Sequence, residues 1–406
     1  MSIAKTLTGN CPVRTFAFSC VNQSTTINYK IYDNCSDLPT NWDSCLPNQS
    51  LLMQTPYLQA IEDANTGNLH YRYVHIEKDG ELCGAAYFQI IPFKGKMGIE
   101  PKDSFFVRTI KNAINAKTFY VLVCGNSFLT GHYGFHYESD KINGTEAFKA
   151  LNGAIEKLCA DKSLNIHMIM AKDFPPAHIE AAKSLVDFKY TETKFQPNMS
   201  LDIRENWVNL DAYKADLLSK YRVRAKKILK KAAEIEVRIL TPEEIRANRS
   251  IIYEYYREVV ERAEFYLAKV NEDYFENCAK NMPENFFLKG YFLEGRLIGF
   301  ITYFIKGGHL ESHFIGYDTA VNRSHKLYNF ILYDLLETAL ENGVKKLVYG
   351  RTAMEIKSTI GAEGVNMNAF LKLTNSFLNR FLSYFTKTLV DENWTPRNPL
   401  KPLPTA

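Results

Sequence analysis

The chain has 406 residues, of which 46% are hydrophobic, 13% aromatic and 23% charged. At the usual ~150 residues per domain this length provides for two or three compact units, and so large an apolar share excludes a disordered, collagen-like or disulfide-knot protein. The net charge is only +4, which is too small to indicate nucleic acid or an anionic membrane as a partner.

No stretch of the sequence approaches the ~18 consecutive apolar residues of a membrane-spanning helix, and the first twenty residues lack the apolar block of a signal peptide. We therefore expect a cytoplasmic protein without a membrane span. Eight cysteines are present, but there is no Cys-x-x-Cys pair that would bring two thiolates to one metal ion. Free thiols and no bound metal are the prediction.

The first predicted element pair is a β-hairpin. Residues 71–76 and 82–91 are rich in β-branched and aromatic side chains, and Asp79-Gly80 between them favours a tight turn. A strand, a helix and a further strand follow at 119–124, about 145–160 and 166–171. Such a crossover returns to the same sheet with a right-handed connection, so this half is predicted to be a mixed α/β sheet.

A glycine-rich stretch, Gly125 to Gly134, follows the strand at 119–124. It lacks both the Gly-Lys-Ser/Thr ending of a P-loop and the Gly-x-Gly-x-x-Gly spacing of a dinucleotide fold. Turn glycines are the simpler interpretation, and a nucleotide site is the alternative.

The pattern weakens near residues 196–209, and the second half then opens with a basic helix at 217–233. Counted at 100° per residue, its apolar side chains form one stripe. The opposite side holds seven cations and no acid within twelve residues, namely Lys220, Arg222, Arg224, Lys226, Lys227, Lys230 and Lys231. Such like charges repel, so either an anionic ligand offsets them or the face is simply solvated.

The hairpin and crossover of the first half recur in the second half, which indicates an internal duplication. The repeat consists of strands at 287–292 and 297–305 around Glu294-Gly295, a strand at 309–317, a helix at 327–342 that ends at Gly343, and a strand at 345–349. We therefore predict two domains, 1–200 and 201–390, followed by a loose tail at 391–406.

Near the end of the second domain, residues 370–389 are predicted to form an amphipathic helix. Leu373, Phe377, Phe381 and Phe385 recur there at helical spacing. A helix that covers the core is favoured over one that lies on a membrane surface, because the segment has few basic residues.

The link between the strand at 309–317 and its crossover helix is a candidate phosphate site. The amino end of a helix offers unpaired N–H groups and a positive dipole at the carboxyl end of a strand. Arg323 and Lys326 add positive side chains there. No glycine-rich cradle like that of a P-loop accompanies them.

The run from Tyr349 to Ala362, YGRTAMEIKSTIGA, resembles the end-of-strand signature of the Fem-like branch of the GNAT superfamily of N-acyltransferases, in which a glycine is followed by a lysine and a second glycine. The basic helix resembles the Arg/Lys-rich helix that precedes the second acyltransferase domain in that branch. The resemblance covers roughly residues 200–375, and the first half is similar in the order of its elements. It implies an α/β fold of two tandem GNAT-like domains, each a mixed sheet flanked by helices.

The same resemblance implies an N-acyltransferase that moves an acyl or aminoacyl group from an activated, phosphate-bearing donor to the amine of a small molecule or peptide. GNAT proteins use acyl-CoA and Fem-like members use aminoacyl-tRNA, so acyl-CoA is one expected donor and aminoacyl-tRNA is the alternative. Loops that bind coenzyme A carry glycines at this position, but the loop at 322–328 has none. The sequence therefore does not decide between the two donors. DNA is not an expected partner.

Amide formation needs a base for the amine, a stabilised oxyanion and a proton for the leaving group. Glu311 and His313 are two residues apart on a predicted strand, so they share a face and could relay the amine proton. Tyr349 ends the last strand and is the candidate to protonate the leaving group. A hydrogen-bonded structural pair is the alternative for the two strand residues.

The remaining candidates bind substrates. Arg351 and Lys357 follow the last strand, where α/β sheets place ligands. The predicted donor or anion site comprises Arg222, Lys226, Arg323, Lys326, Arg351 and Lys357. The acceptor is expected at Arg262, Glu264 and Tyr266, for which solvated helix-end residues are the alternative. A non-catalytic module that binds RNA or anionic lipid through residues 220–231 and a degenerate acyltransferase are the competing functions.

Overall fold

The computed structural model describes residues 13–19, 26–64, 69–94, 108, 118–262, 266–386 and 394–402. The strands of the first half are β1 (Val13–Ser19), β2 (Thr26–Tyr32), β3 (His70–Lys78), β4 (Glu81–Lys94), β5 (Thr118–Cys124), β6 (Phe135–Tyr137), β7 (Ile166–Phe174) and β8 (Thr191–Asp202). Its α-helices are α1 (Thr55–Asp63), α3 (Gly144–Ala160) and α4 (Ile179–Ala182).

The strands of the second half are β9 (Glu236–Ile239), β10 (Phe286–Leu293), β11 (Arg296–Lys306), β12 (His309–Tyr317), β13 (Lys346–Gly350) and β14 (Glu363–Leu373). Its helices are α5 (Leu210–Asp216), α6 (Ser219–Lys231), α7 (Pro242–Ala247), α8 (Arg249–Glu261), α9 (Tyr274–Asn281), α10 (Thr319–His325), α11 (Leu327–Glu341), α12 (Met354–Ser358), α13 (Ser376–Asn379) and α14 (Leu382–Thr386).

Both predicted hairpins are present. β3 pairs with β4 across Asp79 and Gly80, and β10 pairs with β11 across Glu294 and Gly295. All four turn residues have positive φ, between 51° and 87°, which is the backbone twist that tight hairpins require. Both predicted crossovers also form, because β5 and β7 are parallel and β12 and β13 are parallel.

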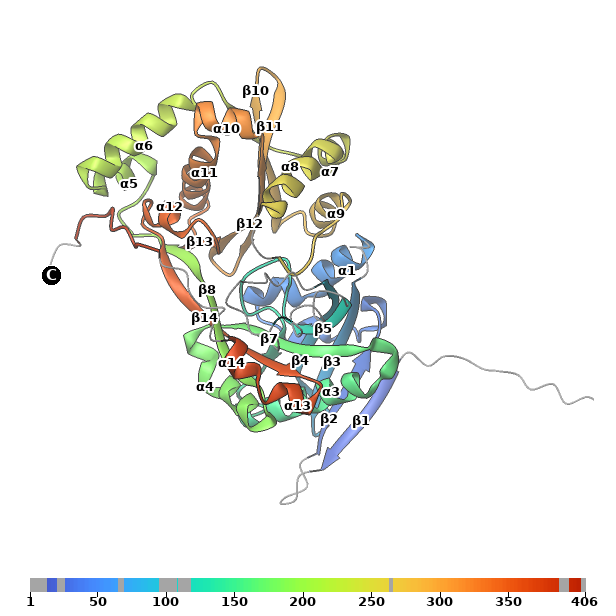
Figure 1. Ribbon diagram of the computed structural model, residues 1–406. Helices are drawn as coiled ribbons and strands as arrows, with labels where there is room; N and C mark the ends of the chain where they lie inside the picture. The colour runs from blue at the N-terminus through green and yellow to red at the C-terminus, as the bar shows by residue number, and fades with distance from the viewer. Residues whose placement is uncertain are drawn as a thin grey trace, which may run out of the picture.

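The two halves exchange their last strands. β8 ends the first half, but its residues 199–202 pair with β13 of the second half. Conversely, residues 368–373 of β14 pair with β7 of the first half, and β14 also pairs with β8. One sheet therefore runs through the molecule in the order β1-β2-β3-β4-β5-β7-β14-β8-β13-β12-β11-β10-β9. Figure 1 shows β8 and β14 lying side by side where the two halves join.

Helices cover both faces of the sheet in the second half. α5, α6 and α11 pack on one face, and α7, α8 and α9 pack on the other (Figure 1). The core under α8 and α9 continues into the first half, where the hydroxyl of Tyr57 on α1 lies 3.4 Å from that of Tyr274 on α9. The two halves thus share one hydrophobic core on this side.

The described part of the predicted helix at 370–389, residues 370–386, does not form one continuous helix. Residues 370–373 belong to β14, whose backbone groups are paired with neighbouring strands. Asn375 then caps the short α13 by accepting from two backbone N–H groups, so a new helix begins after the strand. Phe377 and Phe381 are 67% and 50% exposed, so their helical spacing does not mark a core face. The side chain of Phe385 lies outside the described residues.

The predicted loose tail is anchored over its described part, residues 394–402. The backbone N–H of Leu218 donates to the carbonyl of Pro399 at 2.8 Å, and Leu217 and Leu400 form an isolated β-bridge. The N–H of Lys401 donates to the carbonyl of Asp216 at 2.9 Å. These bonds satisfy backbone groups between α5 and α6, which explains why a proline-rich segment is held there.

Among the described residues no helix combines the length and the apolar character needed to cross a bilayer. The same ranges hold no cluster of His, Cys, Asp and Glu side chains suited to a metal ion. The described cysteines are free thiols, namely Cys35, Cys45, Cys83, Cys124, Cys159 and Cys278. Cys11 and Cys20 lie outside the described residues.

Candidate functional site

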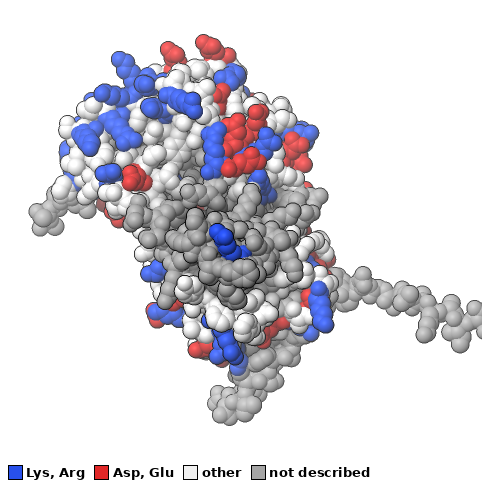
Figure 2. Space-filling view, viewed as in Figure 1, with Lys and Arg blue, Asp and Glu red and all other residues white. Residues whose placement is uncertain are grey.

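The predicted basic helix is α6. It packs on α11 through buried Ala225 and Ile228, so its apolar stripe faces the core as the helical periodicity predicts. Its cations occupy the remaining faces. Figure 2 shows Lys and Arg side chains gathered over this part of the second half.

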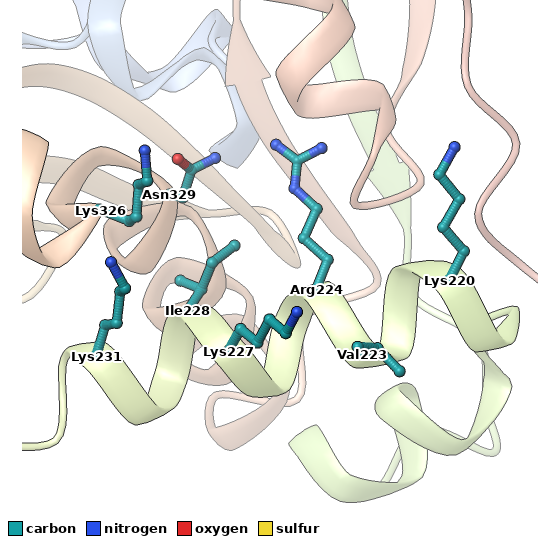
Figure 3. A pocket seen from close by; sticks show the side chains of 8 residues that line it. All are labelled: Lys220, Val223, Arg224, Lys227, Ile228, Lys231, Lys326 and Asn329. Carbon is teal, nitrogen blue, oxygen red and sulfur yellow. The ribbon is translucent and has the colours of Figure 1, made fainter.

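A groove of about 430 Å³ lies between α6 and the start of α11. Successive turns of α6 supply most of its lining, and the link into α11 supplies the rest. Figure 3 shows Lys326 and Asn329 facing the side chains of α6 across this groove. The lining residues are Lys220, Val223, Arg224, Lys227, Ile228, Lys231, Lys326 and Asn329.

The lining of this groove holds five cations and no carboxylate. The nearby ion pairs, Lys214–Asp211 and Arg204–Asp216, involve α5 rather than α6, and in the described part of the chain no α6 cation is paired with an acid. Like charges one helical turn apart repel by a few tenths of a kcal/mol for each pair. A phosphate-bearing ligand would offset this repulsion, so the groove is a candidate anion site.

The crossover link differs from the prediction. The short α10 precedes α11, and the carboxylate of Asp318 caps α10 by accepting from the N–H groups of Ala320 and Val321 at 2.8 and 3.1 Å. An acid therefore occupies the position where a phosphate was expected. Lys326 follows with a positive φ of 58° and lines the groove, whereas Arg323 is exposed outside it.

The parallel strands β12 and β13 diverge towards their carboxyl ends. They pair at three positions, from His309 opposite Lys346 to Glu311 opposite Val348, although β12 continues to Tyr317. In the first half, β5 and β7 stay paired up to the last residue of β5, Cys124. The opening between parallel strands is thus specific to the second half, and Glu311 lies where it begins.

A β-bulge lies in β12 just beyond Glu311. The register against β11 shifts because Ile301 faces Ile315, whereas Tyr303 faces Ser312. Thr302 is buried opposite His313 and Phe314, two residues against one, and its hydroxyl accepts from the N–H of Phe314 at 2.9 Å. Bulges of this kind redirect side chains and are frequent next to active sites.

Glu311 contacts the first half of the molecule, whereas His313 contacts side chains of the second half. Glu311 is 2% exposed, its Oε2 lies 2.6 Å from Nζ of Lys306, and it accepts a hydrogen bond from the hydroxyl of Tyr133. His313 lies 3.5 Å from the hydroxyl of Tyr274. Burial holds the pKa of His313 well below its ordinary value, so this imidazole is neutral near pH 7.

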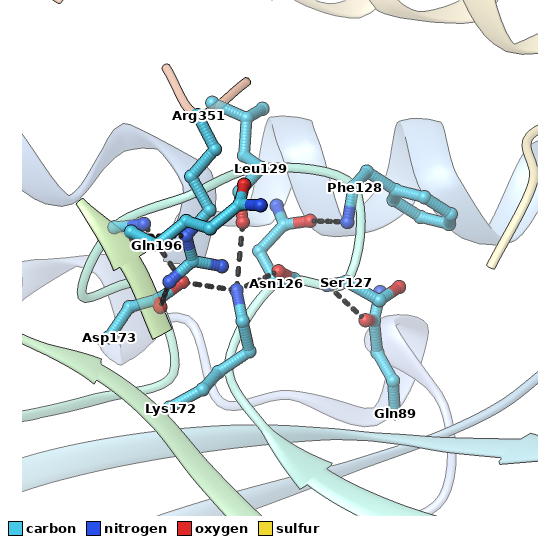
Figure 4. Close-up of polar contacts among 10 residues, drawn as sticks. Gln89, Asn126, Ser127, Phe128, Leu129, Lys172, Asp173, Gln196 and Arg351 are labelled. Carbon is cyan, nitrogen blue, oxygen red and sulfur yellow. Dashed lines mark hydrogen bonds and ion pairs between the residues drawn. The ribbon is translucent and has the colours of Figure 1, made fainter. Parts of the chain in front are cut away.

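Arg351 joins the two halves. Its Nε donates to the carbonyl of Gln196 at 2.9 Å, and its Nη2 pairs with Asp173 at the end of β7. Asp173 is fully buried and also pairs with Lys172 (Figure 4). Burial opposes the charge of Asp173, but Lys172 and Arg351 outweigh it and lower the pKa of this carboxyl. Arg351 is therefore held by an acid and does not line the groove.

Tyr349 and Lys357 are buried in contacts with the backbone. The hydroxyl of Tyr349 donates to the carbonyl of Leu332 at 2.9 Å, and burial raises the pKa of this tyrosine well above its ordinary value. Nζ of Lys357 donates to the carbonyls of Gly350 and Arg351 at 3.1 and 2.6 Å. The lysine of the end-of-strand signature thus ties the turn after β13, outside the groove.

Lys357→Met is expected to remove a pH-dependent part of the stability. Burial lowers the pKa of Lys357 to about 7 from the ordinary 10.5. Between pH 7 and pH 10.5 the unfolded chain therefore binds one more proton at this lysine than the folded chain does. The free energy of unfolding of the wild type should therefore rise with pH above about 7, by up to ~1.4 kcal/mol per pH unit, and this gain is lost as pH falls back towards 7. Urea unfolding across this window measures it. Exposed Lys345→Met is the control, and equal slopes in the wild type and Lys357→Met would contradict the expectation.

The predicted acceptor residues are not assembled into a pocket. Arg262 donates to Glu258 and to the hydroxyl of Thr319, both at 2.7 Å, so it ties α8 to the start of α10. Tyr266 is 39% exposed, and Nζ of Lys269 lies 5.0 Å from its ring centroid. Glu264 lies outside the described residues.

Among the predicted anion-binding residues, Lys326 lines the groove. Arg222 donates to the carbonyl of Ala215 at 3.5 Å, and Lys226 is exposed on another face of α6. The groove instead uses Lys220, Arg224, Lys227 and Lys231, which the sequence analysis placed on the basic side without selecting them. Their spacing of three or four residues was the signal that could have singled them out.

Two further residues of the site, Lys306 and Tyr133, were not predicted. Lys306 ends β11 directly before the turn into β12, a position where a lysine is ordinarily exposed, so its burial beside Glu311 gives no sign in the sequence. Tyr133 lies in the glycine-rich stretch of the first half, far from Glu311 in the chain. A contact of this kind depends on how the two halves pack against each other, so no local sequence pattern predicts it.

Residues 219–358 match the family model of the acetyltransferase (GNAT) domain. The solved structure of FemX matches with a TM-score of 0.51 at 14% identity, over 85% of this chain and 99% of that one. A tandem GNAT protein from the clavulanic acid biosynthesis pathway matches with a TM-score of 0.46 at 9% identity, over 89% and 98% of the two chains. No sequence among the curated proteins matches the chain.

Residues 219–358 therefore form a GNAT acetyltransferase domain, and the chain has the fold of FemX. These findings confirm the predicted resemblance and the predicted mixed α/β class. The matched segment begins at the first residue of α6 and ends at the last residue of α12, so it includes the groove, the opening between β12 and β13, and Glu311.

Proposed function

Because residues 219–358 are a GNAT acetyltransferase domain, we propose that the protein transfers an acyl or aminoacyl group from an activated, phosphate-bearing donor to an amine. The observation that carries the proposal is the groove of five cations beside the start of α11, the helix that connects the two diverging strands β12 and β13. In this proposal Lys220, Arg224, Lys227, Lys231 and Lys326 hold the donor phosphates. We retain the division into domains 1–200 and 201–390 as part of the same proposal.

The length of β12 supports an extended donor. From Glu311 to Tyr317 the strand advances six residues, about 20 Å at ~3.3 Å per residue. Phosphates held near Lys326, after the end of β12, are therefore far from the carboxylate where the strands begin to diverge. Both acyl-CoA and the 3′ end of an aminoacyl-tRNA are long enough in principle, whereas a compact acyl phosphate is not.

The chemistry assigns a role to the buried carboxylate. The amine nitrogen attacks the carbonyl carbon of the donor, a C–N bond forms, and the C–S bond of a thioester or the C–O bond of an ester breaks. Glu311 accepts the proton that the amine loses, and the sulfur or oxygen of the leaving group takes up a proton. Neutral His313, near the bulge of β12, is the second candidate to relay the amine proton.

Direct titration tests the proposal and separates the two donors. We expect acetyl-CoA or an aminoacyl-tRNA to bind the full chain, as measured by isothermal titration calorimetry, and the bound donor to lose its acyl group to an added amine. Binding of a tRNA should weaken steeply with salt because many counterions are released, whereas coenzyme A carries few phosphates and should show a shallow dependence. Binding of neither donor would overturn the proposal. Equal affinity for charged and uncharged tRNA, without transfer, would favour a non-catalytic RNA-binding module.

The compartment belongs to the same proposal. Free, buried thiols are typical of proteins in a reducing environment, and Cys35, Cys45, Cys83, Cys124 and Cys278 are of this kind. These thiols support a cytoplasmic location, where acyl-CoA and aminoacyl-tRNA are both present.

A further inference from the structure

A tyrosine of the first half contacts the proposed base of the second half. The hydroxyl of Tyr133 donates a hydrogen bond to Oε2 of Glu311, the same oxygen that lies 2.6 Å from Nζ of Lys306. Nζ of Lys306 also lies 3.7 Å from the centroid of the Tyr133 ring. The three side chains come from three separate segments and are in mutual contact.

The segment that carries Tyr133 is shaped by its glycines. Gly125 and Gly131 both have a φ of 143°, which L side chains rarely adopt. A Cβ on Gly131 would overlap the ring of Tyr133, and one on Gly134 would overlap the backbone of Gly125. The glycines of this stretch therefore serve its turns, as the sequence favoured. Because they have no side chain, the Tyr133 ring can pack against its own loop.

Buried polar contacts fix this loop to the first-half sheet (Figure 4). Nζ of Lys172 donates to the carbonyls of Asn126 and Leu129 at 2.7 and 2.8 Å. The N–H of Gly131 donates to Oδ2 of Asp173 at 3.1 Å. Because Lys172 and Asp173 are at most 3% exposed, the loop is held by groups that solvent does not reach.

The same loop contacts β12 directly and is connected to the end of β13 through Asp173 of β7. Tyr133 bonds to Glu311 on β12, and Asp173, which holds Gly131, pairs with Arg351 directly after β13. The first half thus fixes both sides of the opening between β12 and β13. The buried hydrogen bond from Tyr133 restrains the orientation of the Glu311 carboxylate.

We propose that Tyr133 is a positioning residue of the transfer reaction, which orients the Glu311 carboxylate towards the incoming amine. The inference rests on the proposed function and extends it, because it makes the reaction centre a composite of both halves. Burial, followed by the neighbouring Glu311, raises the pKa of Tyr133 well above its ordinary value. The hydroxyl therefore remains a donor throughout the working pH range.

Other charged groups near Glu311 stay in place when only this hydroxyl is removed. Lys306 lies on β11, Lys172 on β7 and His309 on β12, and each interacts electrostatically with Glu311. Tyr133→Phe keeps the ring beside Lys306 and deletes one hydrogen-bond donor to the carboxylate. Because that donor favours the charged carboxylate, its loss should displace the acidic limb of the pH–rate profile to higher pH.

The experiment measures acyl transfer from acetyl-CoA, and from aminoacyl-tRNA, to an amine by the full-length Tyr133→Phe variant. We expect kcat to fall by about 10- to 100-fold, KM for the donor to stay unchanged and the acidic limb to move upwards. Tyr213→Phe is the matched control, because it removes a buried hydroxyl that donates at 2.8 Å to the carbonyl of Ile360, away from Glu311.

The possible outcomes separate the inference from the proposed function. Wild-type kcat and an unmoved acidic limb in Tyr133→Phe, alongside an inactive Glu311→Gln, would overturn the inference alone. A lower melting temperature with an unchanged pH profile would also overturn it, because that result describes a purely structural contact. Full activity in Glu311→Gln would instead overturn the role of Glu311 in the proposed function, and the inference with it.

Discussion

Replacing Glu311 by glutamine is expected to lower kcat by about 10²- to 10⁴-fold, the usual contribution of a general base. Glutamine is close in size and still accepts the hydrogen bond of Tyr133, but it cannot take a proton from the amine. KM for the donor should change little, because the phosphates bind in the groove of α6 and α11, away from the carboxylate. Steady-state kinetics of acyl transfer measure both constants.

The control for this variant concerns Lys306. Its Nζ is buried 2.6 Å from Glu311, and breaking a buried pair by removing one partner usually costs about 3–5 kcal/mol. Glu311→Gln combined with Lys306→Met removes both charges and should recover most of that stability while kcat stays low. A double variant that is well folded and fully active would contradict a catalytic role for Glu311.

Reversing two charges of the groove, Arg224→Glu with Lys227→Glu, is expected to weaken donor binding by about 30- to 100-fold. Each reversal removes an attraction of about 0.5–0.7 kcal/mol at an exposed site and adds a repulsion of similar size, so the two reversals together cost about 2–2.8 kcal/mol, and every 1.4 kcal/mol is tenfold in affinity. Neither residue forms an ion pair within the described ranges, so the loss of affinity is not confounded by broken salt bridges. Calorimetric titration of acetyl-CoA or aminoacyl-tRNA measures the change.

The same helix provides the control. Lys226 and Lys230 are exposed on α6 outside the groove, so Lys226→Glu with Lys230→Glu changes the net charge by the same amount. This control should reduce affinity by no more than a few-fold, through long-range attraction that salt screens. Equal losses in the two double variants would show that α6 acts by its total charge and that the groove is not the binding site.

Local signals in the sequence predicted most of the fold. The turn pairs Asp79-Gly80 and Glu294-Gly295 located both hairpins, because few residues tolerate the positive φ found there. The crossover helices followed from the apolar periodicity between strands. The prediction of a helix after residue 370 was wrong because β14 lies between two strands, and pairing on both of its edges overrides the helical spacing of the apolar residues.

The candidate site could be predicted only in part. The basic helix was evident from the sequence. Which of its cations line the groove depends on how α11 packs against it, and in the structure these include Lys220 and Lys227 but not Arg222 or Lys226. Charges on a helix are visible in a sequence, whereas burial against a distant carbonyl or carboxylate is not. Lys357 and Arg351 are accordingly tied to Gly350 and Asp173 instead of a ligand.

The exchange of β8 and β14 has a consequence for how the protein is made and kept folded. Each half borrows its closing strand from the other, so a chain cut near residue 200 would leave β7 with an unpaired edge in one fragment and remove the partner of β13 from the other. Bare edges of this kind invite aggregation. The two halves thus resemble each other in their hairpins and crossovers but cannot be completed separately during synthesis, since the amino-terminal half lacks the strand that pairs with β7 until residue 373 has left the ribosome.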